Sequence, residues 1–85
     1  MGEKLSFSDL IVSLAHTAYT QLGLIENPFT KAKEKDLKSA KDTIDLIDML
    51  QEKTKNNLTE EEEKLIEETL YDMRMKYLYE MDQKK

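Results

Sequence analysis

The feature that most constrains the fold of this chain is a segment without charge. No Lys, Arg, Asp or Glu stands between Leu10 and Ile25, although charged residues make up 36% of the 85-residue sequence. A helix on the surface of a small protein normally carries charges on its outer side. We therefore expect this segment either to be surrounded by the rest of its own fold or to contact a partner.

The first predicted helix spans residues 7–22 and contains most of the uncharged segment. Ser6 and Asp9 match a capping box that starts a helix, and Gly23 supplies the positive-φ residue that commonly ends one. Apolar residues recur between them at steps of three and four, the helical period: Phe7, Leu10, Ile11, Leu14, Ala18 and Leu22. The helix is too short and too polar to cross a membrane, so we expect no membrane contact.

The second predicted helix spans residues 37–54 and follows a linker at residues 24–35. Asn27-Pro28 indicates a turn in the linker, because proline is excluded from a helix interior. Twelve linker residues reach up to about 40 Å, whereas the first helix is only about 24 Å long. The second helix can thus begin at either end of the first, and the sequence leaves their relative direction open.

The third predicted helix spans residues 60–81, with Thr59 and Glu62 as a second capping box. The connection before it is so short that helices two and three are expected to form an antiparallel hairpin. The fold class is therefore all-α, with a single domain over residues 1–85 and short tails at residues 1–5 and 82–85. So small a core is marginally stable, and the chain has no Cys and no Trp. We expect the three-helix unit to assemble into a homo-oligomeric bundle, and the lack of cysteine fits a cytoplasmic protein.

Two surfaces are candidates for contact with a partner. The outer side of the first helix is polar but uncharged, which is typical of an interface between subunits; the alternative is that this helix lies in the middle of its own bundle. The second half of the third helix is apolar nearly all round, so part of it is expected to face a partner. The candidate interface residues are Val12, Ala15, His16, Tyr19, Tyr71, Met75, Leu78 and Tyr79.

Charged and titratable residues point to a catalytic or metal-binding site less clearly than the apolar residues point to an interface. His16 is the one histidine, and without a second ligand on its own helix it is more simply interpreted as a polar interface residue than as a base or metal ligand. Four acids of the second helix share one side and could hold Mg²⁺ or Ca²⁺, although such a row is more often a solvated face: Asp42, Asp45, Asp48 and Glu52. We predict no catalytic residue, metal or cofactor.

Nucleic acid is not an expected partner. The net charge is −5, and residues 59–85 carry nine acids against five bases, whereas DNA-binding proteins neutralise phosphates with Lys and Arg. The one lysine-rich stretch, at residues 31–41, is interleaved with Glu34, Asp36 and Asp42. A solvated loop of mixed charge explains it better than an RNA or anion site.

The sequence resembles a family of small, uncharacterised bacterial proteins that is known only as a domain of unknown function. The resemblance rests on F-S-D-L-I-x-S-L-A from Phe7, on T-I-D-L-I-D-M-L-Q-E-K-T-K from Thr43, and on the Leu70-Tyr71-Asp72 region, and it covers residues 7–79. The chain departs from the family in the linker, where Phe29-Thr30-Lys31 replaces a glycine turn. The resemblance implies a cytoplasmic helical protein and no particular activity.

Two classes of function remain. The first is a non-enzymatic, self-associating module that binds another protein through helix one or the Tyr- and Met-rich end of helix three. The second is a metal-dependent carboxylate enzyme of the all-α nucleotide pyrophosphohydrolase kind, which needs E-E-x-x-E followed by E-x-x-D. In this chain the glutamate after Glu62-Glu63 is Glu67, four positions beyond Glu63 where the pattern requires three. Asp72 likewise lies four positions beyond Glu68 where the pattern requires three. Because the pattern is not matched, we favour the interaction module.

Overall fold

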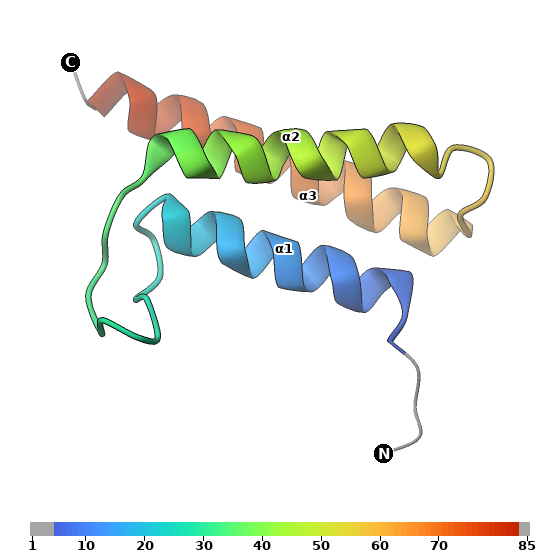
Figure 1. Cartoon of the computed structure of the whole chain (residues 1–85). Helices are drawn as coiled ribbons and strands as arrows, with labels where there is room; N and C mark the ends of the chain where they lie inside the picture. Colours follow the sequence, from blue (N-terminus) through green and yellow to red (C-terminus); the bar gives the residue numbers. More distant parts are fainter. Residues whose placement is uncertain (1–4, 84–85) are drawn as a thin grey trace.

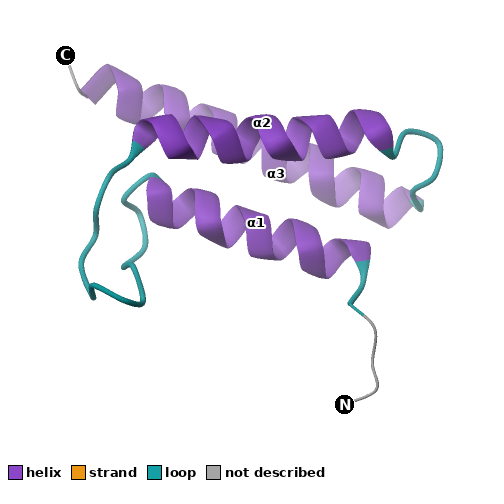
Figure 2. Cartoon of the chain, in the orientation of Figure 1, coloured by secondary structure: helices purple, strands orange, loops and turns teal. Residues whose placement is uncertain are grey.

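The computed structural model describes residues 5–83, and the six terminal residues of the predicted tails lie outside that range. Three helices are present: α1 (Phe7–Gln21), α2 (Leu37–Lys53) and α3 (Glu60–Gln83) (Figures 1 and 2). Residues 5–83 contain no strand, and the one β-type pairing within them is an isolated bridge between Leu22 and Lys35. The all-α prediction is confirmed; α1 and α2 end one residue earlier than predicted, and α3 extends through Gln83 into the predicted tail.

Capping side chains start α1 and α3 as the sequence predicts. The Asp9 N–H donates to Ser6 Oγ at 3.1 Å, and the Ser6 N–H donates to Asp9 Oδ2 at 3.0 Å. The Glu62 N–H likewise donates to Thr59 Oγ1 at 3.1 Å, with the reciprocal bond to Glu62 Oε1 at 2.9 Å. These bonds satisfy backbone groups that have no partner within the helix.

A Schellman motif ends α1. Gly23 has a φ of 81°, and its N–H donates to the Thr20 carbonyl at 3.0 Å, while the Leu24 N–H donates to the Tyr19 carbonyl at 3.0 Å. A side chain at position 23 would also be crowded, because a Cβ there would lie 2.7 Å from Lys35 Cγ. Glycine is therefore required both by the backbone conformation and by the close approach of the linker.

The linker folds back on itself and returns to the end of α1. Asn27 organises it, accepting from the Phe29 N–H at 2.8 Å on its side chain and from the Lys31 N–H at 2.8 Å on its backbone. The Asp36 N–H then donates to the Gln21 carbonyl at 2.7 Å. Because α2 starts beside the end of α1, the chain runs in opposite directions along these helices, and in Figure 1 it runs along α3 in the same direction as along α1. This settles the direction that the sequence leaves open.

The core lies between the three helices, each of which contacts the other two. Its main cluster consists of Ile11, Ala18, Ile44, Ile47, Ile66, Leu70 and Met73. A smaller cluster of Leu22, Leu37 and Ala40 lies near the linker, and Tyr19 and Tyr77 pack against both clusters. The molecule is thin, with extents of 40 × 31 × 16 Å, so each helix keeps one side that its neighbours do not cover.

Ion pairs with Lys35 and Asp48 connect α3 to the linker and to α2. Lys35 Nζ of the linker lies 2.5 Å from Glu80 Oε1, and the Glu80 residue is only 7% exposed. Arg74 of α3 lies 3.0 Å from Asp48 of α2. A buried carboxylate is costly unless it is paired, so Lys35 fixes the linker against the C-terminal half of α3.

Candidate interaction surface

One side of α3 is buried in the core, and the opposite side is exposed. Ile66, Leu70 and Met73 are buried in the core. Four large side chains on the other side are exposed, by 69, 53, 65 and 62% respectively: Tyr71, Met75, Leu78 and Tyr79. Residues three or four positions apart share one side of a helix, so these four form a continuous strip, here named the α3 apolar row.

The α3 apolar row exposes a large area for a protein of this size. A tyrosine side chain buries roughly 150–250 Å² when fully covered, so Tyr71 and Tyr79 together expose on the order of 250 Å². With Met75 and Leu78 the patch reaches the few hundred Å² of the largest apolar patch on a typical monomer, a patch that is often functional.

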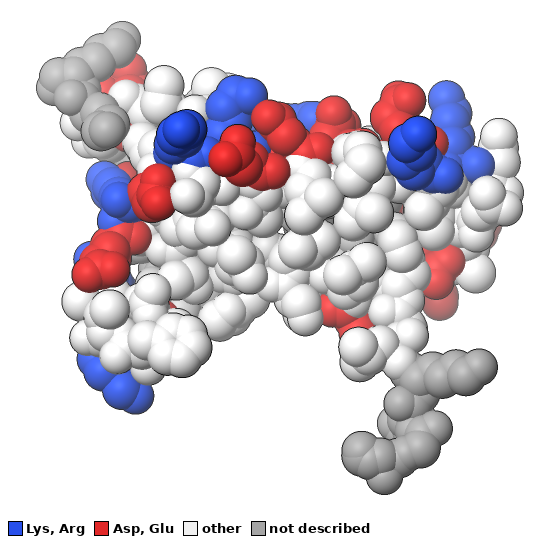
Figure 3. All heavy atoms as spheres, viewed as in Figure 1, with Lys and Arg blue, Asp and Glu red and all other residues white. Residues whose placement is uncertain are grey.

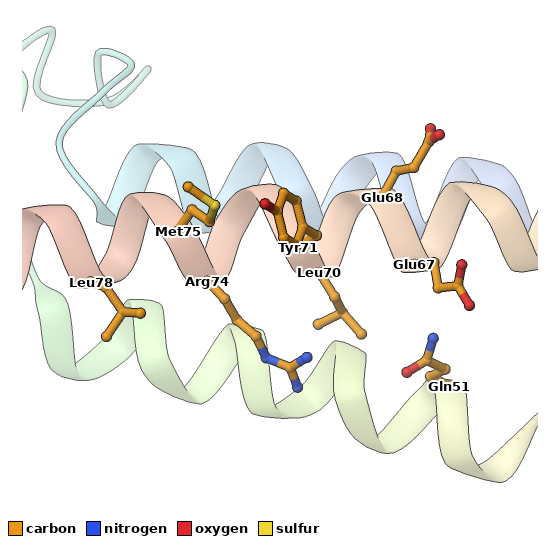
Figure 4. A pocket seen from close by; sticks show the side chains of 8 residues that line it. All are labelled: Gln51, Glu67, Glu68, Leu70, Tyr71, Arg74, Met75 and Leu78. Carbon is orange, nitrogen blue, oxygen red and sulfur yellow. The ribbon is translucent and has the colours of Figure 1, made fainter.

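Two shallow grooves flank the row. The larger has a volume of about 590 Å³ and lies between α2 and α3 (Figure 4); it is lined by Gln51, Glu67, Glu68, Leu70, Tyr71, Arg74, Met75 and Leu78. The smaller, of about 450 Å³, lies on the linker side and is lined by Leu24, Tyr71, Asp72, Met75, Lys76, Tyr79 and Glu80. Tyr71 and Met75 line both grooves, so they form the ridge between them.

The polar groups on the linker side of the row are bonded to one another. The Tyr19 hydroxyl donates to Asp72 Oδ2, Lys76 Nζ lies 2.6 Å from Asp72 Oδ1, and the same ammonium lies 5.9 Å from the centre of the Tyr19 ring. Burial, assisted by the hydrogen bond to Asp72, raises the pKa of Tyr19 to about 12. The bond from Lys76, followed by that from Tyr19, lowers the pKa of Asp72 below its ordinary value. This network joins α1 to α3 and leaves Asp72 ionised and already paired.

The predicted interface residues of α1 do not all face the same way. Val12 and His16 are exposed, whereas Ala15 and Tyr19 are partly buried and pack against the main core. Tyr19 contacts the protein's own α3 through its hydroxyl. The uncharged segment thus divides into an inner side, used by the core, and an outer side over which the surface in Figure 3 is largely uncharged. Contact of either surface with a partner stays a prediction.

The acids of α2 are arranged as a solvated face with counter-ions. Asp45 pairs with Lys41 at 2.9 Å, and Asp48 pairs with Arg74. Within residues 5–83 no three His, Cys, Asp or Glu side chains lie close enough together to hold a metal ion, and this includes Asp42 and Glu52. Among the helices of that part of the chain, none combines the length and the apolar character needed to cross a membrane.

Several residues of the surface are not apparent from the sequence. Leu24 reaches the row because the chain turns toward α3 after the Schellman motif, and Gln51 of α2 lines the same groove as Glu67 and Arg74 of α3. Arg74 itself follows Tyr71 by three positions, so the helical period alone places it beside the row. Only the packing of α2 on α3 brings Gln51 to the same groove.

The fold and surface define a class: a small all-α protein of three helices with an exposed apolar strip on the longest of them. The chain belongs to the family described as domain of unknown function (DUF1844), whose sequence profile matches residues 4–80. This confirms the resemblance to an uncharacterised domain family. Comparison with curated proteins gave no match, and comparison with solved structures gave none either.

Proposed function

We propose that the protein is a non-enzymatic interaction module that binds another protein through the α3 apolar row. The observation that carries this proposal is the exposure of Tyr71, Met75, Leu78 and Tyr79 side by side on one helix. The core does not use these side chains, because the inner side of α3 already supplies its buried residues. Their burial by a partner would contribute roughly 1.5–3 kcal/mol for each fully covered aliphatic or Met side chain.

The residue types of the row suit this role. Tyrosine is enriched among the residues that dominate binding energy at protein interfaces, and methionine adapts its shape to a partner surface. Arg74 and the Tyr19–Asp72–Lys76 network border the row with polar groups held in ion pairs. A polar border around an apolar centre is the usual anatomy of an interface.

Site-specific photo-crosslinking in the source cell tests the proposal. A photoreactive phenylalanine analogue replaces Tyr79 in one variant and Phe29 in the other; Phe29 is an aromatic residue of the linker that is 90% exposed and lies outside both grooves. We expect a discrete heavier adduct only from position 79. Adducts from position 29 alone, or the same adducts from both positions, would contradict the assignment of the row.

The uncharged outer side of α1 supports a second proposal, self-association into a homo-oligomeric bundle built from the α2/α3 hairpin and α1. Val12 and His16 are exposed there without a neighbouring charge on the same segment.

Sedimentation velocity at micromolar concentration tests self-association. We expect the sedimenting species of wild type to have a mass above the 10.0 kDa of one chain. The double variant Val12→Glu/His16→Glu should sediment as a monomer. Lys38→Glu changes the net charge equally on exposed α2 surface and serves as the control; a monomeric wild type would sink the proposal.

The carboxylate-enzyme alternative receives no support from the arrangement of the described residues. Asp45 and Asp48 are paired with Lys41 and Arg74 rather than directed into a shared site. The grooves beside the row are open and shallow, whereas catalytic centres of this kind bring several carboxylates together around a metal. We therefore retain the interaction module as the proposed function.

A further inference from the structure

A single trough follows the outer side of the seam between α2 and α3. The larger groove, between α2 and α3, adjoins a smaller hollow of about 230 Å³ near the loop at residues 54–59. Gln51 and Glu67 line both the groove and the hollow. Along α3 the trough extends from Glu63 to Leu78, which corresponds to about 22 Å at the helical rise. Its length therefore matches about four turns of a helix.

The trough has an apolar end and an acidic end. Tyr71, Met75 and Leu78 line the first. Four glutamates line the other end together with Leu58 and Ile66, namely Glu52, Glu63, Glu67 and Glu68, and within residues 5–83 none of the four forms an ion pair. Of the two bases in the trough, Arg74 is bound to Asp48 at 3.0 Å, which leaves Lys55 as the remaining one. Unpaired like charges in a hollow create a local potential that attracts cations.

The shape of the trough favours a helical occupant. It is bounded by two helices that pack side by side, and α1 contributes to the core beneath them. A fourth helix laid along such a seam would complete a bundle, an arrangement in which side chains of one helix fill the space between two others. An amphipathic helix offers anchors at i, i+3 or i+4, and i+7 for this kind of groove.

We propose that the trough binds an amphipathic helix of another protein that carries Lys or Arg beside its apolar side. The inference rests on the proposed function of the row and adds the class of partner. Charge complementarity selects this occupant over a second copy of the same chain. The copy has a net charge of −5; its α1 contains no Lys or Arg, its α2 carries three bases against four acids, and its α3 carries three bases against nine acids. It therefore offers no basic helix to the glutamates.

Two synthetic helical peptides serve as probes. Both are about 15 residues long, matching the trough at 1.5 Å per residue, and both carry leucine at the anchor positions; one has flanking lysines and the other has glutamates in their place. We expect the basic peptide to bind the full chain at least tenfold more tightly, with weaker binding at high salt because the charges are at the surface. Amide NMR shifts should change at Gln51, Glu67 and Leu78.

Matched variants test the role of the glutamates. Glu67→Gln/Glu68→Gln should weaken binding of the basic peptide about fivefold, in line with two surface charge pairs. Glu60→Gln/Glu61→Gln makes the same change in net charge at the start of α3, outside the trough, and should leave the affinity unchanged. Far-UV circular dichroism confirms that each variant is folded.

The outcomes separate this inference from the proposed function. Equal binding of both peptides in the trough, or equal effects of the two double variants, would overturn the preference for a basic helix while leaving the row as a binding surface. Absence of binding by the basic peptide, or shifts confined to residues outside the trough, would overturn the inference outright. Crosslinking from position 79 independently decides the proposed function.

Discussion

Replacing Tyr19 by phenylalanine removes one hydrogen bond between α1 and α3 and leaves the ring in place. The lost bond joins the Tyr19 hydroxyl to the carboxylate of Asp72. Hydrogen bonds to charged groups contribute about 1.5–3 kcal/mol, but Asp72 also accepts from Lys76 at 2.6 Å and neither group is fully buried. We therefore expect Tyr19→Phe to lower the free energy of unfolding by about 1 kcal/mol, equivalent to a fall in Tm of about 4–8 °C for a domain of this size.

The contribution of the Tyr19 hydroxyl depends on pH. Burial and the bond to Asp72 raise its pKa from 10.0 to about 12 in the folded protein, so folding favours the protonated phenol. A group whose pKa is raised on folding gives its full stabilisation below the unfolded value and loses it as pH rises through the folded value. The difference in stability between wild type and Tyr19→Phe should thus be constant from about pH 5, where Asp72 is ionised, to about pH 10, and should fall as the pH approaches 12.

Urea denaturation followed by circular dichroism at a series of pH values measures this difference. Tyr79→Phe is the control, because that hydroxyl belongs to a residue 62% exposed and its loss should change stability by less than about 0.5 kcal/mol. If Tyr19→Phe is as stable as wild type at pH 8, or if the difference is the same at pH 8 and pH 12, the bond does not hold α1 to α3 as described.

Three further substitutions probe other parts of the fold by the same denaturation assay. Gly23→Ala should cost about 1–2 kcal/mol, because position 23 has a φ of 81° and a Cβ there meets Lys35; unchanged stability would contradict the requirement for glycine. Ile66→Ala should cost about 2–5 kcal/mol, because Ile66 is fully buried in the main cluster; a cost below about 1 kcal/mol would refute that placement. Glu80→Ala should destabilise the chain near neutral pH, and Lys35→Ala should do so more strongly because it leaves the buried Glu80 carboxylate unpaired; equal stability of all three proteins would contradict the ion pair's role.

Local features of the fold follow from the sequence because they depend on residues close together in the chain. The capping boxes at Ser6 and Thr59 each need one residue pair three positions apart, and the end of α1 needs only Gly23. Each of these features depends only on residues within about one turn of helix, and each is present in the structure. The apolar row on α3 is also a local pattern, since its members recur at the helical period.

Features that join distant segments do not follow from the sequence. The return of the linker depends on the bond between Asp36 and Gln21 and on the pairing of Lys35 with Glu80, which lie far apart in the chain. The inward direction of Tyr19 depends on Asp72, 53 positions away. The acidic trough likewise exists only because α2 brings Gln51 beside Glu67. Such contacts are set by helix packing, which the periodicity of one helix does not fix.

The α3 apolar row is proposed to bind a partner without being needed for folding. The most direct test is affinity purification from the source cell with wild type and two variants, Tyr71→Lys/Tyr79→Lys and Glu60→Gln/Glu61→Gln. The two variants change the net charge equally. Each variant's free energy of unfolding is measured alongside. We predict that the tyrosine variant stays within about 1 kcal/mol of wild type yet loses a partner that the glutamate variant retains. Equal recovery of that partner by all three proteins would contradict the claim.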